Sequence, residues 1–173
     1  MFDVILAPTD GSEHATRAMA VATDLATKYG SRLVVMHVLL HHVTAQEIEH
    51  ILKGAEINDD MRAEIRGLRS VSAPIPVGGS GGRDTPSRAL AEKVGAHIVR
   101  VAKQRAEAAG VVQISTLVLT GSPSKQIVQV SELEKAQLVV MGVRGLGGLQ
   151  SILHGSVSLS VRNSCHCACL TIP

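Results

Sequence analysis

The residues with the clearest chemical potential lie near the C-terminus. Two residues separate Gly142 from Gly145, nine more follow, and Gly155 and Ser156 come next. Paired glycines let a backbone approach an anion closely, and a Gly-Ser pair that opens a helix offers free N–H groups at the positive end of the helix dipole. The pattern predicts a site for the phosphates of a nucleotide. The alternative is a flexible glycine loop followed by an ordinary helix cap.

A second candidate is the turn 8–12, which directly follows the apolar segment 4–7. Asp10 could hydrogen-bond a ribose or an amine, or help organise a metal–phosphate pair, or it could cap the next helix. Ser12 fits a cap better than a ligand. Arg144 could reach a phosphate or could simply be solvated. No serine lies in a nucleophile elbow and no motif places a Ser/His/Asp set, so no catalytic residue is predicted.

Three cysteines alternate with other residues at Cys165, Cys167 and Cys169. An odd number in one strand-like segment does not suggest a disulfide framework. Metal binding is the alternative, but alternate residues on a flat strand project about 7 Å apart, too far to share one zinc ion without a turn. We therefore expect small buried side chains, with one exposed thiol at most, and no metal site. We expect His37, inside an apolar run, to be a hydrogen-bonded core residue.

Composition narrows the class of protein. With 173 residues, 45% of them hydrophobic and 18% charged, the chain is expected to fold as a single domain over residues 1–173. A net charge of +2 and only two aromatic residues, Phe2 and Tyr29, argue against nucleic-acid binding. The sequence contains no apolar run of about 20 residues and no signal-peptide pattern, so we expect no membrane association and a cytoplasmic location.

Periodicity predicts alternating strands and helices. Strands are expected at residues 4–7, 33–40, 112–119, 138–141 and 169–172. Helices are expected from residue 12 to 29, at 44–66, at 86–109, after Pro123 in a segment that carries Ile127, Val130 and Leu133, and at 156–162. A Gly/Ser/Pro-rich insertion near 70–87 is interpreted as a mobile surface loop. The alternation predicts an α/β fold, a doubly wound parallel sheet with helices on both faces. Ligands of such sheets bind beyond the carboxyl ends of the strands, where both candidate segments lie.

Taken together, the two ends of the chain resemble the universal stress protein family. The segment 4–12, Val-Ile-Leu-Ala-Pro-Thr-Asp-Gly-Ser, is similar to the family's first strand and turn, and residues 142–156 match its ATP-binding pattern G-x-x-G-(nine)-G-S/T. The resemblance covers residues 1–40 and 112–173. It implies a five-stranded parallel α/β fold of the adenine nucleotide alpha hydrolase type. It also implies a homodimer that pairs through the C-terminal strand, and ATP binding, which some family members lack.

The resemblance also implies roles for individual residues. Pro8, Thr9 and Asp10 would line the adenosine, Val38 and Met141 would meet the adenine from two sides, and Gly142 would approach the ribose. The phosphates, with Mg²⁺ or Mn²⁺ held mainly by them, would be surrounded by Arg144, Gly145, Gly155, Ser156 and Val157. Val38 and Met141 make this slot aliphatic, in keeping with the scarcity of aromatic residues.

Three functions are compatible with the sequence. The first is an ATP-binding stress-response protein with a regulatory output, in which the nucleotide orders the 142–155 loop. The second is a slow ATPase or autokinase that uses Asp10 or a loop serine. The third is a nucleotide-free dimer that acts by protein interaction alone. A phosphate-binding pattern with no evident base or nucleophile favours the first, and leaves enzymatic activity an open question that leans towards none.

Overall fold

The computed structural model describes residues 1–39, 85–145 and 155–173. In these ranges the elements are β1 (Val4–Pro8), α1 (Glu13–Tyr29), β2 (Arg32–Leu39), α4 (Thr85–Ala108), β3 (Ile114–Thr120), α5 (Pro123–Leu133), β4 (Leu138–Gly142), α6 (Ser156–Ser164) and β5 (Ala168–Ile172). The predicted strands are confirmed to within two residues at each end. The helix expected at 44–66, the insertion up to residue 84 and the residues between Gly145 and Gly155 lie outside the described ranges.

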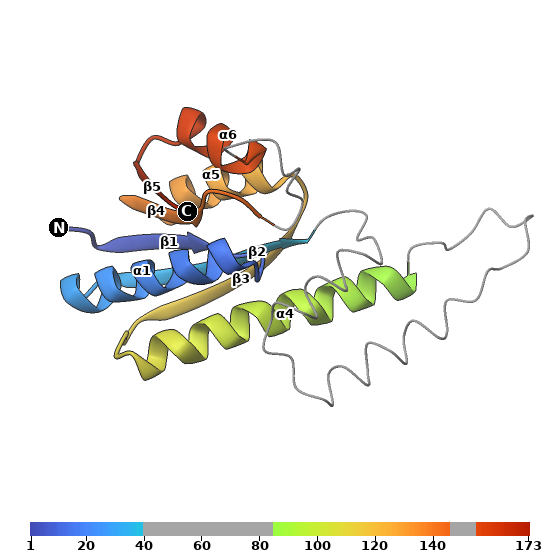
Figure 1. Cartoon of the computed structure of the whole chain (residues 1–173), viewed down its shortest axis with the longest axis horizontal. Coiled ribbons are helices and arrows are strands. Elements are labelled where there is room, and N and C mark those ends of the chain that lie inside the picture. The colour runs from blue at the N-terminus through green and yellow to red at the C-terminus, as the bar shows by residue number, and fades with distance from the viewer. Residues whose placement is uncertain (40–84, 146–154) are drawn as a thin grey trace, which may run out of the picture.

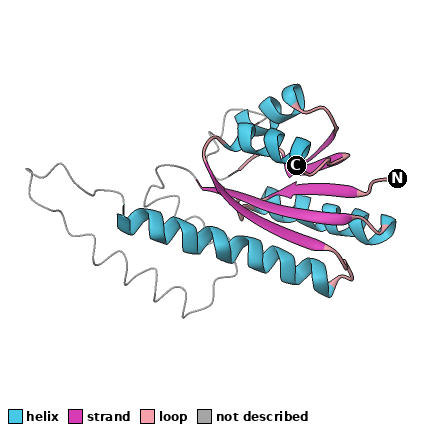
Figure 2. Cartoon of the chain, turned by 180° about the vertical axis from the view of Figure 1, so that it is seen from behind, coloured by secondary structure: helices cyan, strands magenta, loops and turns pink. Residues whose placement is uncertain are grey.

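The strands form one parallel sheet in the order β3-β2-β1-β4-β5. Helices α1 and α4 cover one face of the sheet, and α5 and α6 cover the other (Figures 1 and 2). The chain moves outward from β1 through β2 to β3, then returns to the other side of β1 to form β4 and β5. The predicted doubly wound architecture is therefore confirmed. Its topological switch point lies between β1 and β4, which pair at Ile5–Leu138 and Leu6–Val139.

Strand residues alternate between two aliphatic cores. On the α1/α4 face, Ile5, Leu33 and Val140 pack with the small side chains of α1, and on the α5/α6 face Leu6, Val34 and Val139 pack with α5 and α6; all six strand residues are fully buried. Burial on both faces explains why these strands read as continuous apolar runs. Helix α5 contains Ile127, Val130 and Leu133, as expected. Ile127 and Val130 are buried, whereas Leu133, the last residue of the helix before the C-cap Glu134, is 73% exposed.

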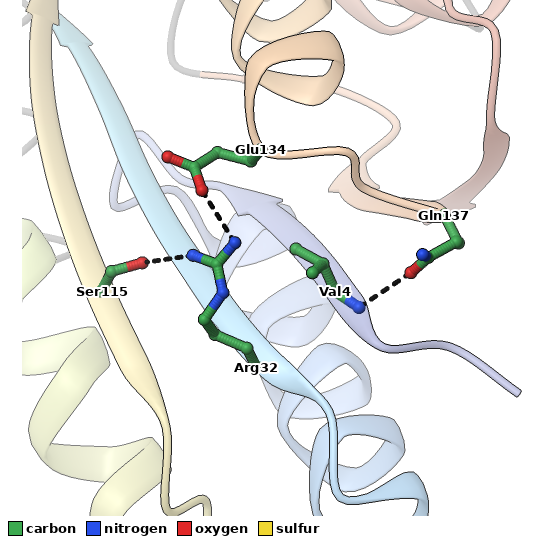
Figure 3. A network of polar contacts seen from close by, with 5 residues as sticks. All are labelled: Val4, Arg32, Ser115, Glu134 and Gln137. Atoms are coloured by element: carbon green, nitrogen blue, oxygen red, sulfur yellow. Dashed lines mark hydrogen bonds and ion pairs between the residues drawn. The ribbon is translucent and has the colours of Figure 1, made fainter.

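Polar contacts tie the sheet together at the amino ends of its strands (Figure 3). The Arg32 guanidinium donates to Glu134 at 2.8 Å and to the Ser115 hydroxyl at 3.4 Å. The side-chain carbonyl of Gln137 accepts from the Val4 N–H at 2.8 Å. These contacts connect β1, β2 and β3 to the α5–β4 segment. They lie at the end of the sheet opposite the carboxyl ends, where the candidate binding residues are.

Candidate nucleotide site

The turn after β1 is fixed by hydrogen bonds to neighbouring elements. The Thr9 N–H donates to the Met36 carbonyl at 2.8 Å, and the Thr9 carbonyl lies 2.8 Å from Nδ1 of His37. Both side chains are buried. Burial lowers the pKa of His37, although the Thr9 carbonyl and the charge of Asp10 act in the opposite direction. A neutral ring with its proton on Nδ1 donates to Thr9, which confirms His37 as a hydrogen-bonded core residue.

Asp10 and Ser12 shape the start of α1. The Asp10 Oδ1 accepts from the Ser12 N–H at 3.0 Å, and the Ser12 hydroxyl accepts from the Ala15 N–H at 3.2 Å. Ser12 is thus the N-cap that the sequence predicted. The two interpretations of Asp10 do not exclude each other, because one carboxylate oxygen stabilises the turn while the other, Oδ2, faces the loop after β4. A Cβ added at Gly145 would collide with that oxygen.

The backbone of the β4 end passes unusually close to the turn after β1. A Cβ added at Gly142 would lie 2.9 Å from the His14 carbonyl carbon and 2.9 Å from the Ala15 nitrogen, both of them backbone atoms of α1. With the collision between Gly145 and Asp10, this places the carboxyl ends of β1 and β4 in contact. The two segments that the sequence predicted to converge therefore lie side by side.

The two ends of the 145–155 segment are held together. The Val143 carbonyl accepts from the Gly155 N–H at 2.9 Å and from the Ser158 hydroxyl at 2.8 Å. A Cβ at Gly155 would lie 2.8 Å from that same carbonyl oxygen. Ser158 is buried, and its hydroxyl also lies 3.0 Å from the Gly155 carbonyl. No sequence pattern singles out Ser158, because its partners are backbone atoms of Val143 and Gly155 that only the folded chain brings near it.

Helix α6 begins beside these glycines without a side-chain cap. Gly155 is the N-cap, with φ −66° and ψ 143°, and the first intrahelical bond runs from the Leu159 N–H to the Gly155 carbonyl. The N–H groups of Ser156 and Val157 therefore have no partner within the helix, as at any uncapped start. They combine with the helix dipole to favour an anion. The Arg144 side chain is half-buried and forms no hydrogen bond or ion pair with another residue in the described ranges.

The residues predicted for the base lie on either side of the β1 end. Val38 near the end of β2 and Met141 near the end of β4 both pack on the α5/α6 face, and β1 with Pro8 runs between them. Met141 is buried, whereas Val38 and Pro8 keep part of their surface exposed. The structure thus gathers the apolar candidates at one edge of the sheet, next to the glycine loop.

The described residues contain no group of three or more His, Cys, Asp or Glu side chains arranged to hold a metal ion.

Comparison with known proteins assigns the fold to a family. The family model described as "Universal stress protein family" matches residues 1–173. The chain belongs to the universal stress protein family. A relative from Thermus aquaticus, named "Universal stress protein in QAH/OAS sulfhydrylase 3'region", is 33% identical over 99% of both chains. The family resemblance drawn from the two ends of the sequence is therefore confirmed.

Two solved structures of universal stress proteins share the fold at lower identity. One, described in complex with cAMP, superposes with a TM-score of 0.60 at 21% identity and covers 99% of this chain and 97% of its own. The other, from Archaeoglobus fulgidus in complex with dAMP, has a TM-score of 0.57 at 15% identity and covers 100% and 98%. At these identities the likeness establishes the α/β fold.

Within the described ranges, no helix is both long and apolar enough to span a bilayer.

Proposed function

We propose that this universal stress protein binds an adenine nucleotide, with ATP as the preferred ligand, where the carboxyl ends of β1 and β4 meet. The observation that carries the proposal is the close approach of backbone at Gly142, Gly145 and Gly155, where any Cβ would collide with the protein. The last of these glycines is the N-cap of α6, which has no side-chain cap. The free backbone N–H groups and the positive dipole end of α6 therefore lie at the carboxyl ends of the strands, where ligands of such sheets bind.

The proposed contacts follow the geometry from base to phosphate. The adenosine would lie over the apolar edge and the β1 turn, and the phosphates would lie at the start of α6. The residues concerned are Pro8, Thr9, Asp10, Val38, Met141 and Gly142 for the adenosine, and Arg144, Gly145, Gly155, Ser156 and Val157 for the phosphates. Mg²⁺ or Mn²⁺ would enter with the nucleotide, held mainly by phosphate oxygens. The cAMP and dAMP complexes of structural relatives support an adenine ligand; the triphosphate rests on the glycine pattern of this chain.

Titration calorimetry of the full chain with ATP, ADP and AMP, each with and without Mg²⁺, tests the proposal. We expect Gly145→Val to abolish the heat of ATP binding, because its side chain would occupy the space beside Asp10. Arg144→Gln separates the two roles left open for that residue. If the guanidinium meets a phosphate, ATP binding weakens about 10- to 100-fold and AMP binding changes little. No binding heat with any of the three nucleotides in the wild type would refute the proposal.

The regulatory role, as opposed to catalysis, needs a separate measurement. We expect phosphate release from ATP by the wild type to be no faster than by Asp10→Ala, because neither a sequence motif nor the described residues place a general base and a nucleophile together at the proposed phosphate site. We further propose a homodimer that pairs along β5, which is the outer strand of the sheet and hydrogen-bonds to β4 on its inner side. Light scattering of the purified chain with and without ATP measures that assembly directly.

A further inference from the structure

Three thiols gather at the other end of α6, away from the proposed nucleotide site. Strand β5 begins only at Ala168, so Cys165 is the C-cap of α6 and Cys167 lies in the bend before the strand. The expected separation of about 7 Å for a flat strand is therefore wrong for this pair. Their sulfur atoms are 3.3 Å apart, because the bend turns both side chains towards the core between α5 and β4.

Cys165 has a further polar neighbour. The Ser131 hydroxyl of α5 lies 3.2 Å from the Cys165 sulfur, and Ser131 is buried. Cys169 lies within β5, its sulfur is 3.7 Å from the Cys167 carbonyl, and its thiol also interacts with Cys165 and Cys167. All three side chains are partly exposed, so the expectation of buried side chains with one exposed thiol is wrong, and none of the three is in a disulfide. The structure thus contains two reduced thiols in sulfur–sulfur contact, both partly exposed to solvent, and a third thiol beside them.

We propose that Cys165 and Cys167 are a peroxide-sensitive dithiol that closes to an intramolecular disulfide. In the first step the Cys165 thiolate attacks one oxygen of a hydroperoxide, the O–O bond breaks, and Cys165 becomes a sulfenic acid while the other oxygen leaves as hydroxide or alkoxide. In the second step the Cys167 sulfur attacks the Cys165 sulfur. Its proton and the departing hydroxyl form water, and the sulfurs are joined. The hydroperoxide is reduced by two electrons and the dithiol is oxidised by two.

The surroundings assign these two roles. Burial raises the pKa of Cys165, but its hydrogen bonds with Ser131, Cys167 and Cys169 outweigh burial and leave that pKa below the ordinary thiol value. Burial, the hydrogen bond to Cys165 and its charge raise the pKa of Cys167 to about 12. Of the pair, Cys165 therefore loses its proton more readily and reacts with the peroxide, and Cys167 is the thiol that keeps its proton until the second step. A normal disulfide needs sulfurs about 2 Å apart, so the bend must close by little more than 1 Å.

Peroxide treatment of the full-length protein, followed by alkylation and mass spectrometry, tests the proposal. Because residues 163–173 contain neither Lys nor Arg, trypsin releases all three cysteines in one peptide. We expect that peptide to lose two hydrogens and to carry a single alkyl group, on Cys169. Three alkylated cysteines after peroxide, a bond that involves Cys169, or a disulfide between two chains would each overturn the proposal.

Variants separate the roles of the sulfurs. Cys167→Ser removes the resolving thiol, so a sulfenic acid should accumulate on Cys165 and react with dimedone. Cys165→Ser should slow the reaction with peroxide by about tenfold or more, and Ser131→Ala should slow it to a lesser degree. Cys169→Ser is the matched control and should still form the Cys165–Cys167 disulfide, because it keeps both reacting sulfurs. Oxidation of Cys165→Ser at the wild-type rate would contradict the assignment, with folding of each variant checked by circular dichroism.

Discussion

Substitution of Gly142 by alanine tests how tightly the two halves of the site are joined. Gly142 is the last residue of β4 and is buried against the first turn of α1. The new Cβ would lie 2.9 Å from backbone atoms of His14 and Ala15. Backbone atoms in a helix cannot rotate away as a side chain does. We therefore expect Gly142→Ala to push α1 and β4 apart and to lower both the stability of the protein and its affinity for ATP.

The size of the effect follows from the geometry. Ordinary van der Waals contact with a Cβ begins at 3.4 Å, so the 2.9 Å approach leaves a shortfall of 3.4 − 2.9 = 0.5 Å. Overpacking of this kind in a well-packed core costs about 1–3 kcal/mol. For a chain of this length each kcal/mol lowers the melting temperature by about 2–4 °C, so a fall of roughly 2–12 °C is expected.

Thermal unfolding and ATP titration of the same samples give the test. Gly30→Ala is the control, because Gly30 has φ 64° and nothing within 4 Å of an added Cβ. Its cost is conformational, about 1–2 kcal/mol for a left-handed residue, and it ends α1 at the opposite end from the site. Gly30→Ala should therefore lower the melting temperature and leave ATP affinity unchanged. A Gly142→Ala protein that melts within about 1 °C of the wild type and binds ATP normally would refute the argument.

Two further predictions concern stability. Because burial lowers the pKa of His37 in the folded state, its contribution to stability is complete above its unfolded value of 6.5 and is lost as pH falls through the folded pKa, by up to about 1.4 kcal/mol per pH unit. His37→Asn keeps a donor for Thr9 and cannot titrate, so urea unfolding should show the wild-type advantage shrinking below pH 6.5; a constant difference would contradict this. Glu134→Gln should cost about 0.5–1 kcal/mol, since Arg32 and Glu134 are each 32% exposed, and about 1 M NaCl should reduce the difference. A loss that salt does not change would show that the charge pair is not its source.

The sequence predicted the order of elements well because each strand is buried on both faces and reads as an apolar run. It also predicted which segments meet, since parallel strands present their carboxyl ends at one edge of the sheet. It could not predict that Oδ2 of Asp10 lies against Gly145, because that contact depends on the packing of β1 beside β4. Leu133 shows the limit of periodicity. The spacing matched the buried face of α5, but the helix ends at that residue.

The cysteines show a similar limit at shorter range. Alternation in Cys165–Cys169 suggests one extended strand, whereas the structure ends α6 at the first cysteine and starts β5 three residues later. The exact start of β5 decides whether the sulfurs of Cys165 and Cys167 lie close together on a bend or apart along an extended strand. Boundaries of this kind are set by helix capping and tertiary packing, which a single sequence specifies poorly.

Helix α6 is only nine residues long, and it joins the two chemically distinct regions of the molecule. Its first turn faces the proposed phosphates, and its last residue precedes Cys165. Thermodynamic linkage then imposes a reciprocal relation. By whatever factor the Cys165–Cys167 disulfide changes the affinity for ATP, a bound nucleotide must change the equilibrium constant for forming that disulfide. This coupling free energy can be measured in both directions. Its size gives the extent to which oxidation of the cysteines and nucleotide binding influence each other.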